Sequence, residues 1–137
     1  MRRITALVTA FVFASSSAIA EELPGKAKCS DASLAGNYRT LVTGTYGNVS
    51  GDTPVNFAVT GLMNFNGDGT IEEFIYNSSL GGTLFSATAS GTYSIDAKCV
   101  GALNVAGITA SIVVTGSGFT GLVTVSNGWV GTVTGTK

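Results

Sequence analysis

The chain has 137 residues, of which 45% are hydrophobic and 11% are charged, and this length and composition fit one folded domain rather than a disordered chain. It contains no histidine, which excludes Ser–His and Cys–His nucleophile pairs, an imidazole base and most zinc sites. The formal net charge of -1 excludes a nucleic-acid partner that is held by a basic surface.

The first twenty residues have the features of a signal peptide. Two arginines precede an apolar run over 4–14, and small residues then end in Ala18-Ile19-Ala20, the A-x-A pattern that signal peptidase recognises. The apolar run is about eleven residues long, which is too short to span a bilayer as a helix and argues against the alternative of a retained anchor. We therefore expect that residues 1–20 are a signal peptide and that the mature chain is exported.

The mature chain contains two cysteines, Cys29 and Cys99. An even number of cysteines in an exported protein indicates a disulfide. The single intramolecular pairing closes a loop of about 70 residues, and such a bond contributes about 3–4 kcal/mol. The alternatives are a metal pair and a redox site, but the chain has neither histidine nor a C-x-x-C motif.

The composition of residues 21–137 favours β-strands. This part contains 16 threonines and 12 valines against 8 leucines, and no window shows a helical repeat of apolar residues beyond a short turn at 31–34. Turns rich in glycine, asparagine and aspartate divide it at short intervals, at 66–69, 81–82, 96–97, 106–107, 116–118 and 127–128. The predicted strands are 36–46, 55–66, 70–78, 83–95, 99–105, 108–115, 119–126 and 129–135.

Apolar and polar residues alternate along these strands, which is typical of an antiparallel sheet with one buried face. Eight such strands joined by hairpins can close into an up-and-down barrel without exposed edges. The alternative is a two-sheet β-sandwich, but its crossovers need long connections and only the loop 48–54 is of modest length. We predict an all-β antiparallel barrel at 36–137, preceded by a leader at 21–35. The alternation places Phe57, Val59, Met63 and Phe65 on one face, Trp129 and Val133 on one face, and Phe74 and Tyr76 opposite Ile71 and Ile75.

Three stretches resemble small secreted bacterial proteins of the calycin, or lipocalin-like, kind. In residues 29–38, CSDASLAGNY, a cysteine and a G-x-[WY] motif lead into the first strand. Residues 61–69, GLMNFNGDG, and 90–101, SGTYSIDAKCVG, match a hairpin turn, a G-T-Y strand and a second cysteine. The resemblance implies a periplasmic or extracellular bacterial barrel that binds a small hydrophobic molecule inside. The chain differs from true lipocalins in having Tyr38 where they have tryptophan and in lacking a C-terminal helical pattern.

The acidic residues do not predict a catalytic pair. Glu72 and Glu73 are neighbours on a strand, so they should point to opposite faces and not converge on one cleft. Glu73 shares the predicted face of Ile71 and Ile75, and if it points inward it needs Arg39 as a partner in the pocket; otherwise the two glutamates are a solvated pair. Serine and threonine are abundant without a base to activate them, and no phosphate-binding loop is present. We expect no catalytic residue, no metal and no cofactor.

Aromatic and glycine residues carry the functional hypothesis. The interior of an eight-stranded barrel is filled by side chains or holds one small ligand. Strand glycines leave space either for tight curvature of the barrel or for a ligand, and those to inspect are Gly36, Gly44, Gly61, Gly91, Gly121 and Gly131. We expect a non-catalytic binding protein for a small apolar or amphipathic molecule. The candidate pocket residues are Tyr38, Phe57, Phe65, Tyr93, Trp129, Arg39 and Glu73.

Two other classes of protein stay open. A structural or interaction protein would have a solid barrel and an exposed apolar patch. A small outer-membrane barrel would have an apolar outer band and a polar interior. The chain lacks a terminal aromatic residue and contains the cysteine pair, so we do not expect stable membrane insertion. The sequence identifies neither the ligand nor a protein partner.

Overall fold

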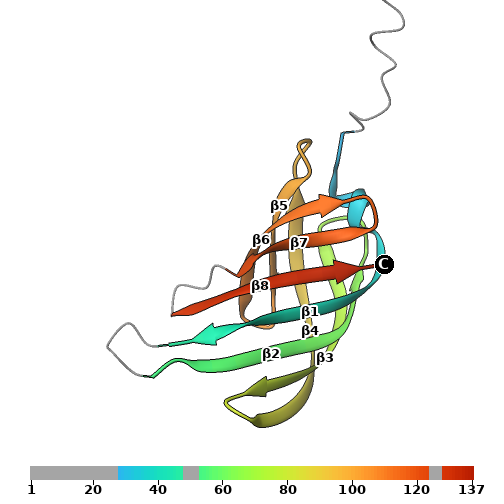
Figure 1. The fold of residues 1–137 in the computed structure, drawn as a ribbon. Helices are drawn as coiled ribbons and strands as arrows, with labels where there is room; N and C mark the ends of the chain where they lie inside the picture. The colour runs from blue at the N-terminus through green and yellow to red at the C-terminus, as the bar shows by residue number, and fades with distance from the viewer. Residues whose placement is uncertain (1–27, 48–52, 124–127) are drawn as a thin grey trace, which may run out of the picture.

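A computed structural model describes residues 28–47, 53–123 and 128–137. These ranges contain one short 3-10 helix, η1 (Asp31–Leu34), and eight strands. Each strand pairs antiparallel with the next, and β8 returns to β1, so the sheet closes into an up-and-down barrel (Figure 1). The strands are β1 (Gly36–Tyr46), β2 (Val55–Phe65), β3 (Thr70–Leu80), β4 (Thr83–Ile95), β5 (Val100–Val105), β6 (Ile108–Thr115), β7 (Gly118–Val123) and β8 (Trp129–Thr136).

The structure confirms the predicted barrel over the β-sandwich, and it confirms the order of the strands and the short helical turn. The predicted bounds agree for β1, β4 and β6, β3 ends two residues later than predicted, and β7 begins one residue earlier. The last predicted residues of β7, 124–126, lie outside the described residues. The predicted signal peptide, residues 21–27 of the leader and most of the loop 48–54 lie outside the described residues.

Apolar side chains fill the barrel interior. Among the described residues, the only buried polar or charged side chains are Thr40 and Ser78. The Thr40 hydroxyl donates a hydrogen bond to the carbonyl of Tyr38 at 3.3 Å. One buried side chain, Leu34, comes from η1 and the others come from the strands. The buried apolar strand residues are Tyr38, Val42, Phe57, Val59, Met63, Phe65, Ile71, Phe74, Tyr93, Ile95, Leu103, Val105, Ala110, Ile112, Phe119, Val123 and Val133.

The strand glycines allow the barrel sheet to curve, and they do not line open space. A Cβ atom at Gly61 would overlap the carbonyl oxygen of Ile75 on β3, and one at Gly121 would overlap that of Ser111 on β6. Comparable overlaps with a neighbouring strand occur at Gly44, Gly91 and Gly131. Because these positions already touch backbone, glycine allows the strands to bend closely past one another. The glycine content therefore does not indicate a ligand cavity.

In the described ranges, the two ends of the barrel differ in the position of η1. The hairpins β2–β3, β4–β5 and β6–β7 lie at one end together with η1, and we call this the closed end (Figure 1). The connections β1–β2, β3–β4, β5–β6 and β7–β8 lie at the other, which we call the open end. No helix corresponding to η1 lies over the open end in the part of the chain that the structure describes.

Candidate functional site

An aromatic cluster fills the interior at the closed end. Phe65 is at its centre, with ring centroids 5.3 Å from Tyr38, 5.0 Å from Tyr93 and 5.6 Å from Phe119. These contacts are edge-to-face, the arrangement that the charge distribution of aromatic rings favours. Burial raises the pKa of the Tyr38 and Tyr93 hydroxyls above the usual value. Three predicted pocket residues, Tyr38, Phe65 and Tyr93, thus pack against one another.

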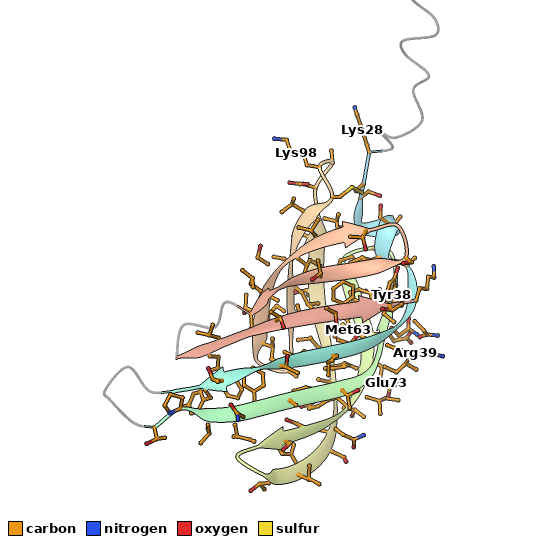
Figure 2. The ribbon with its side chains drawn as sticks, in the orientation of Figure 1. Lys28, Tyr38, Arg39, Met63, Glu73 and Lys98 are labelled. Atoms are coloured by element: carbon orange, nitrogen blue, oxygen red, sulfur yellow. A yellow bond between two sulfur atoms is a disulfide. The ribbon has the colours of Figure 1, made fainter. Side chains whose placement is uncertain are left out.

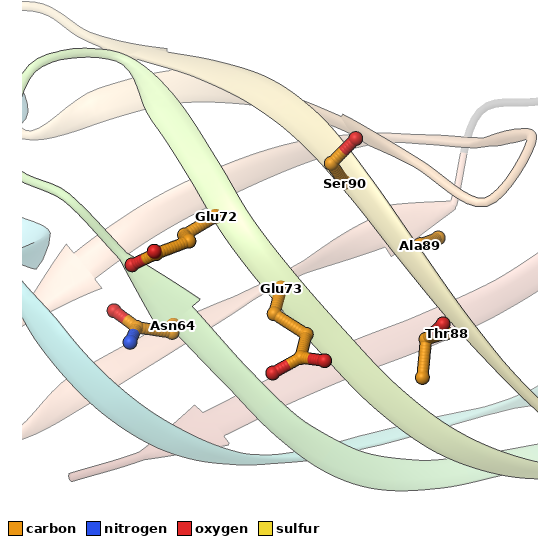
Figure 3. A pocket seen from close by; sticks show the side chains of 6 residues that line it. All are labelled: Asn64, Glu72, Glu73, Thr88, Ala89 and Ser90. Carbon is orange, nitrogen blue, oxygen red and sulfur yellow. The ribbon is translucent and has the colours of Figure 1, made fainter.

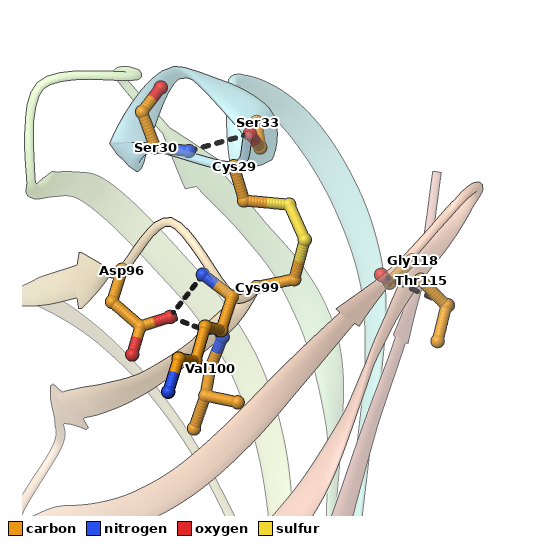
Figure 4. Close-up of a disulfide and its surroundings, with 9 residues drawn as sticks. Cys29, Ser30, Ser33, Asp96, Cys99, Val100, Thr115 and Gly118 are labelled. Atoms are coloured by element: carbon orange, nitrogen blue, oxygen red, sulfur yellow. Dashed lines mark hydrogen bonds between the residues drawn. A yellow bond between two sulfur atoms is a disulfide. The ribbon is translucent and has the colours of Figure 1, made fainter. Parts of the chain in front are cut away.

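The leader is attached to the closed end by a disulfide and by hydrogen bonds that include one from Lys137 Nζ to the carbonyl of Ala35 at 2.9 Å. The Cys29–Cys99 disulfide joins it to the β4–β5 turn across a Cα–Cα distance of 4.9 Å, as predicted (Figure 4). The Tyr93 hydroxyl donates to the backbone carbonyl of Asp31 at 2.8 Å, and the Ile95 N–H donates to Asp31 Oδ1 at 2.7 Å. These bonds satisfy polar groups at the end of the barrel and hold Leu34 over the aromatic cluster.

An apolar pocket of about 320 Å³ lies at the open end. Trp129 is its largest side chain, and its ring lies 4.6 Å from that of Tyr46 and 4.7 Å from that of Phe57. The lining contains no charged residue, and its side-chain polar groups are two hydroxyls and the indole N–H. The lining residues are Val59, Tyr76, Ser78, Phe85, Ala106, Gly107, Ile108 and Trp129.

Glu72 and Glu73 lie in a β-bulge. The register between β3 and β4 shifts between Ile71 and Phe74, so that both glutamates stand opposite Ser90. Both are exposed although Ile71 and Phe74, on either side, are buried. Their side chains therefore leave the strand on the outer surface (Figure 3). The predictions that the glutamates point to opposite faces and that Ile71 lies opposite Phe74 are wrong, because the bulge interrupts the alternation.

The predicted inward pair of Arg39 and Glu73 is also wrong. Both residues are exposed on the outside of the barrel (Figure 2). Glu72 and Glu73 instead border a depression of about 720 Å³ together with Asn64, Thr88, Ala89 and Ser90. This depression is larger than the open-end pocket, but it is polar and open to solvent. No group of three or more metal-binding side chains occurs in the described ranges. We therefore regard the smaller, apolar pocket as the candidate site.

The sequence predictions identified only part of this pocket. Trp129 lines it, and Phe57 packs directly behind Trp129. Tyr76 and Phe85 were not among the candidates, although they lie on the two strands that flank the turn at 81–82. The signal that distinguishes Tyr76 and Phe85 is that both are aromatic residues close to an open-end turn. The sequence alone does not show which end of the barrel η1 covers, so it does not show which turns are at the open end.

The comparisons with known proteins do not assign the chain to a family: no family model, no curated protein and no solved structure matches it. The resemblance to lipocalin-like proteins therefore stays a prediction from sequence motifs. Within the ranges that the structure describes, no helix has the length and apolar character needed to cross a membrane.

Proposed function

We propose that this protein is an exported, non-catalytic binding protein of lipocalin-like type that takes a small, uncharged, apolar molecule at the open end of the barrel. The observation that supports this function is the apolar pocket of about 320 Å³ beside Trp129. Ligand pockets typically measure about 300–1,000 Å³ and have apolar walls with a few polar groups. The volume lies near the lower limit of that range, so the ligand should be no larger than one or two fused rings.

The pocket lining determines the charge of the proposed ligand. A charged group placed there would lose water without gaining an oppositely charged partner, which is costly. The hydroxyls of Ser78 and Tyr76 can orient one polar atom of a neutral ligand. The rings of Trp129, Tyr76 and Phe85 would supply most of the contact area.

The Cys29–Cys99 disulfide supports the proposed location, because disulfides persist mainly in oxidising compartments. Together with the signal-like N-terminus, it favours the periplasm or the outside of a bacterial cell. The apolar interior supports a barrel that does not insert into a membrane, since outer-membrane barrels have the opposite arrangement.

A structural or interaction protein is the second candidate. Its supporting observation is that the closed-end half is packed with aromatic side chains and that apolar side chains lie on the outside. Leu84 is 79% exposed and Val130 is 67% exposed. Under this alternative the open-end pocket would hold only water.

The single tryptophan of the chain makes the proposed function directly testable. 1-Naphthylamine is a neutral apolar probe of two fused rings that accepts energy from tryptophan. We expect it to bind once per chain and to quench Trp129 emission. Ser78→Phe would fill the pocket and weaken probe binding at least about tenfold. Ser111→Phe, which adds the same ring on the exposed outer face of β6, should leave binding unchanged.

Two results would favour the second candidate instead. One is an absence of energy transfer from Trp129 at saturating probe. The other is equal binding by the Ser78→Phe and Ser111→Phe variants, which would place the probe outside the pocket.

A further inference from the structure

One part of β4 has a strand partner on one side only. The register between β3 and β4 continues to the pair of Leu80 and Thr83. The register between β4 and β5 begins only at the pair of Gly91 and Val105. Residues 83–90 therefore have no neighbour on the β5 side among the described strands. Figure 1 shows the β3–β4 hairpin extending beyond the other strands at the bottom of the view. We call residues 83–90 the free edge.

The turn of this hairpin indicates which backbone groups point to the free edge. Gly81 and Gly82 have φ angles of 57° and 89°, as in a two-residue type I′ turn, whose flanking residues exchange hydrogen bonds. Because antiparallel pairs alternate, every second pair from there is a close pair without backbone hydrogen bonds between the strands. Ser86 and Asn77 form such a pair, and the Ser86 hydroxyl donates to Asn77 Oδ1 at 2.6 Å.

The N–H and C=O groups of Leu84, Ser86 and Thr88 accordingly point away from β3. Natural proteins protect such edges with charged residues, proline or bulges. The free edge has the sequence TLFSATAS, which contains none of the charged residues or proline. Its apolar side chains are also uncovered, with Leu84 79% exposed and Phe85 48% exposed. The free edge is therefore suited to receive another strand.

We propose that the free edge pairs with the free edge of a second copy of this chain. The two β4 strands would run antiparallel about a two-fold axis at Ser86, so that Ser86 faces its own copy. This register places Leu84 beside Thr88 and Phe85 beside Ala87. Each two-fold pair exchanges hydrogen bonds through the groups that now face solvent.

The chemistry of the free edge favours a copy of itself over an unrelated peptide. In a two-fold pairing the residue on the axis faces its own copy, so a charge at that position would meet a like charge. None of the eight residues is charged. The large Phe85 lies opposite the small Ala87, which avoids a clash on the inner face. A two-fold interface is also closed, so association should stop at the dimer.

Sedimentation velocity of the oxidised, exported protein over a range of concentrations tests the proposal. We expect a reversible dimer without any added ligand. Ser86→Lys places two ammonium groups across the axis and should raise the dimer dissociation constant at least about tenfold. Thr120→Lys is the matched control, because Thr120 is also exposed but lies on β7 between paired residues Val113 and Thr134. It should leave the dimer intact.

A second variant and a second measurement keep the test independent of side-chain charge. Ser86→Pro removes one edge donor without removing a backbone hydrogen bond to β3, although it also removes the side-chain bond to Asn77, and it should also give a monomer. Hydrogen exchange should show the amides of Leu84, Ser86 and Thr88 becoming protected as the protein concentration rises. Circular dichroism of both Ser86 variants confirms that the barrel is folded.

Four results would overturn the proposal. The first is a protein that stays monomeric with unprotected edge amides, and the second is a monomer whose edge amides are already protected by another segment. The third is association that continues beyond the dimer. The fourth is a dimer that Ser86→Lys leaves unchanged. Because the dimer is measured without a probe, its absence would leave the proposed binding function untouched. Loss of probe binding would likewise leave the dimer untouched.

Discussion

The closed and open ends of this barrel are built from the same eight strands but are stabilised differently. The closed end combines a helical cover, a disulfide and an interlocked aromatic cluster. The open end has a pocket beside Trp129 and a hairpin with an unpaired edge. All charged residues of the described ranges lie in the closed-end half: Lys28, Asp31, Arg39, Asp68, Glu72, Glu73, Asp96, Lys98 and Lys137. Packing and cross-links are thus concentrated at the closed end in the described ranges.

Matched phenylalanine substitutions should show the largest difference between the two ends. Phe65 is 1% exposed at the centre of the closed-end cluster, and Phe65→Ala should lower the free energy of unfolding by about 3–5 kcal/mol. Phe85 is 48% exposed at the open end, and Phe85→Ala should cost no more than about 1.5 kcal/mol. Chemical denaturation of both variants measures this. Equal losses would contradict the view that stability is concentrated at the closed end.

Removing the disulfide should give the next largest effect. Replacing both Cys29 and Cys99 by serine opens a loop with a sequence separation of 70 and should lower the free energy of unfolding by about 3–4 kcal/mol. Reductant should destabilise the original protein and have no effect on the double variant, which is the control. Probe binding at the open end should persist at temperatures where the variant is folded.

Unchanged stability of the original protein under reductant would show that the purified protein lacks the bond. Loss of probe binding in a folded double variant would show that the two ends are coupled rather than independent.

The sequence was sufficient to predict much of this fold. Period-two alternation and short glycine turns placed the strands, and the cysteine count predicted the covalent link between Cys29 and Cys99. The alternation and the turns are local features of the sequence, and two cysteines can form only one intramolecular pair. Ile71 shows where local reasoning fails, because the bulge at Glu72 and Glu73 puts it on the same face as Phe74. The register of β4, rather than the sequence of β3, determines that position.

The candidate site was predicted less well for a related reason. Tyr38 and Trp129 are both aromatic strand residues that face inward, and no local pattern distinguishes the one that packs from the one that lines a pocket. The difference arises because Leu34 covers one end of the barrel. The role of Gly61 was equally undecided, since only the closeness of the Ile75 carbonyl shows that it serves curvature. Such features depend on contacts between distant segments.

The smallest predicted effect concerns alkaline pH and again involves the closed end. Burial raises the pKa of the Tyr38 and Tyr93 hydroxyls, so the folded protein holds these protons more tightly than the unfolded chain does. The contribution of these two protonated hydroxyls to the free energy of unfolding is fully present below the unfolded-state pKa of about 10. It is lost as the pH rises through the folded-state pKa values. Urea midpoints measured from about pH 9 upward should therefore fall above pH 10. Tyr38→Phe removes one titrating group and should make the fall shallower. An equally steep fall in this variant would show that Tyr38 ionisation does not contribute, and the alkaline sensitivity would then have to arise outside the aromatic cluster or from Tyr93 alone.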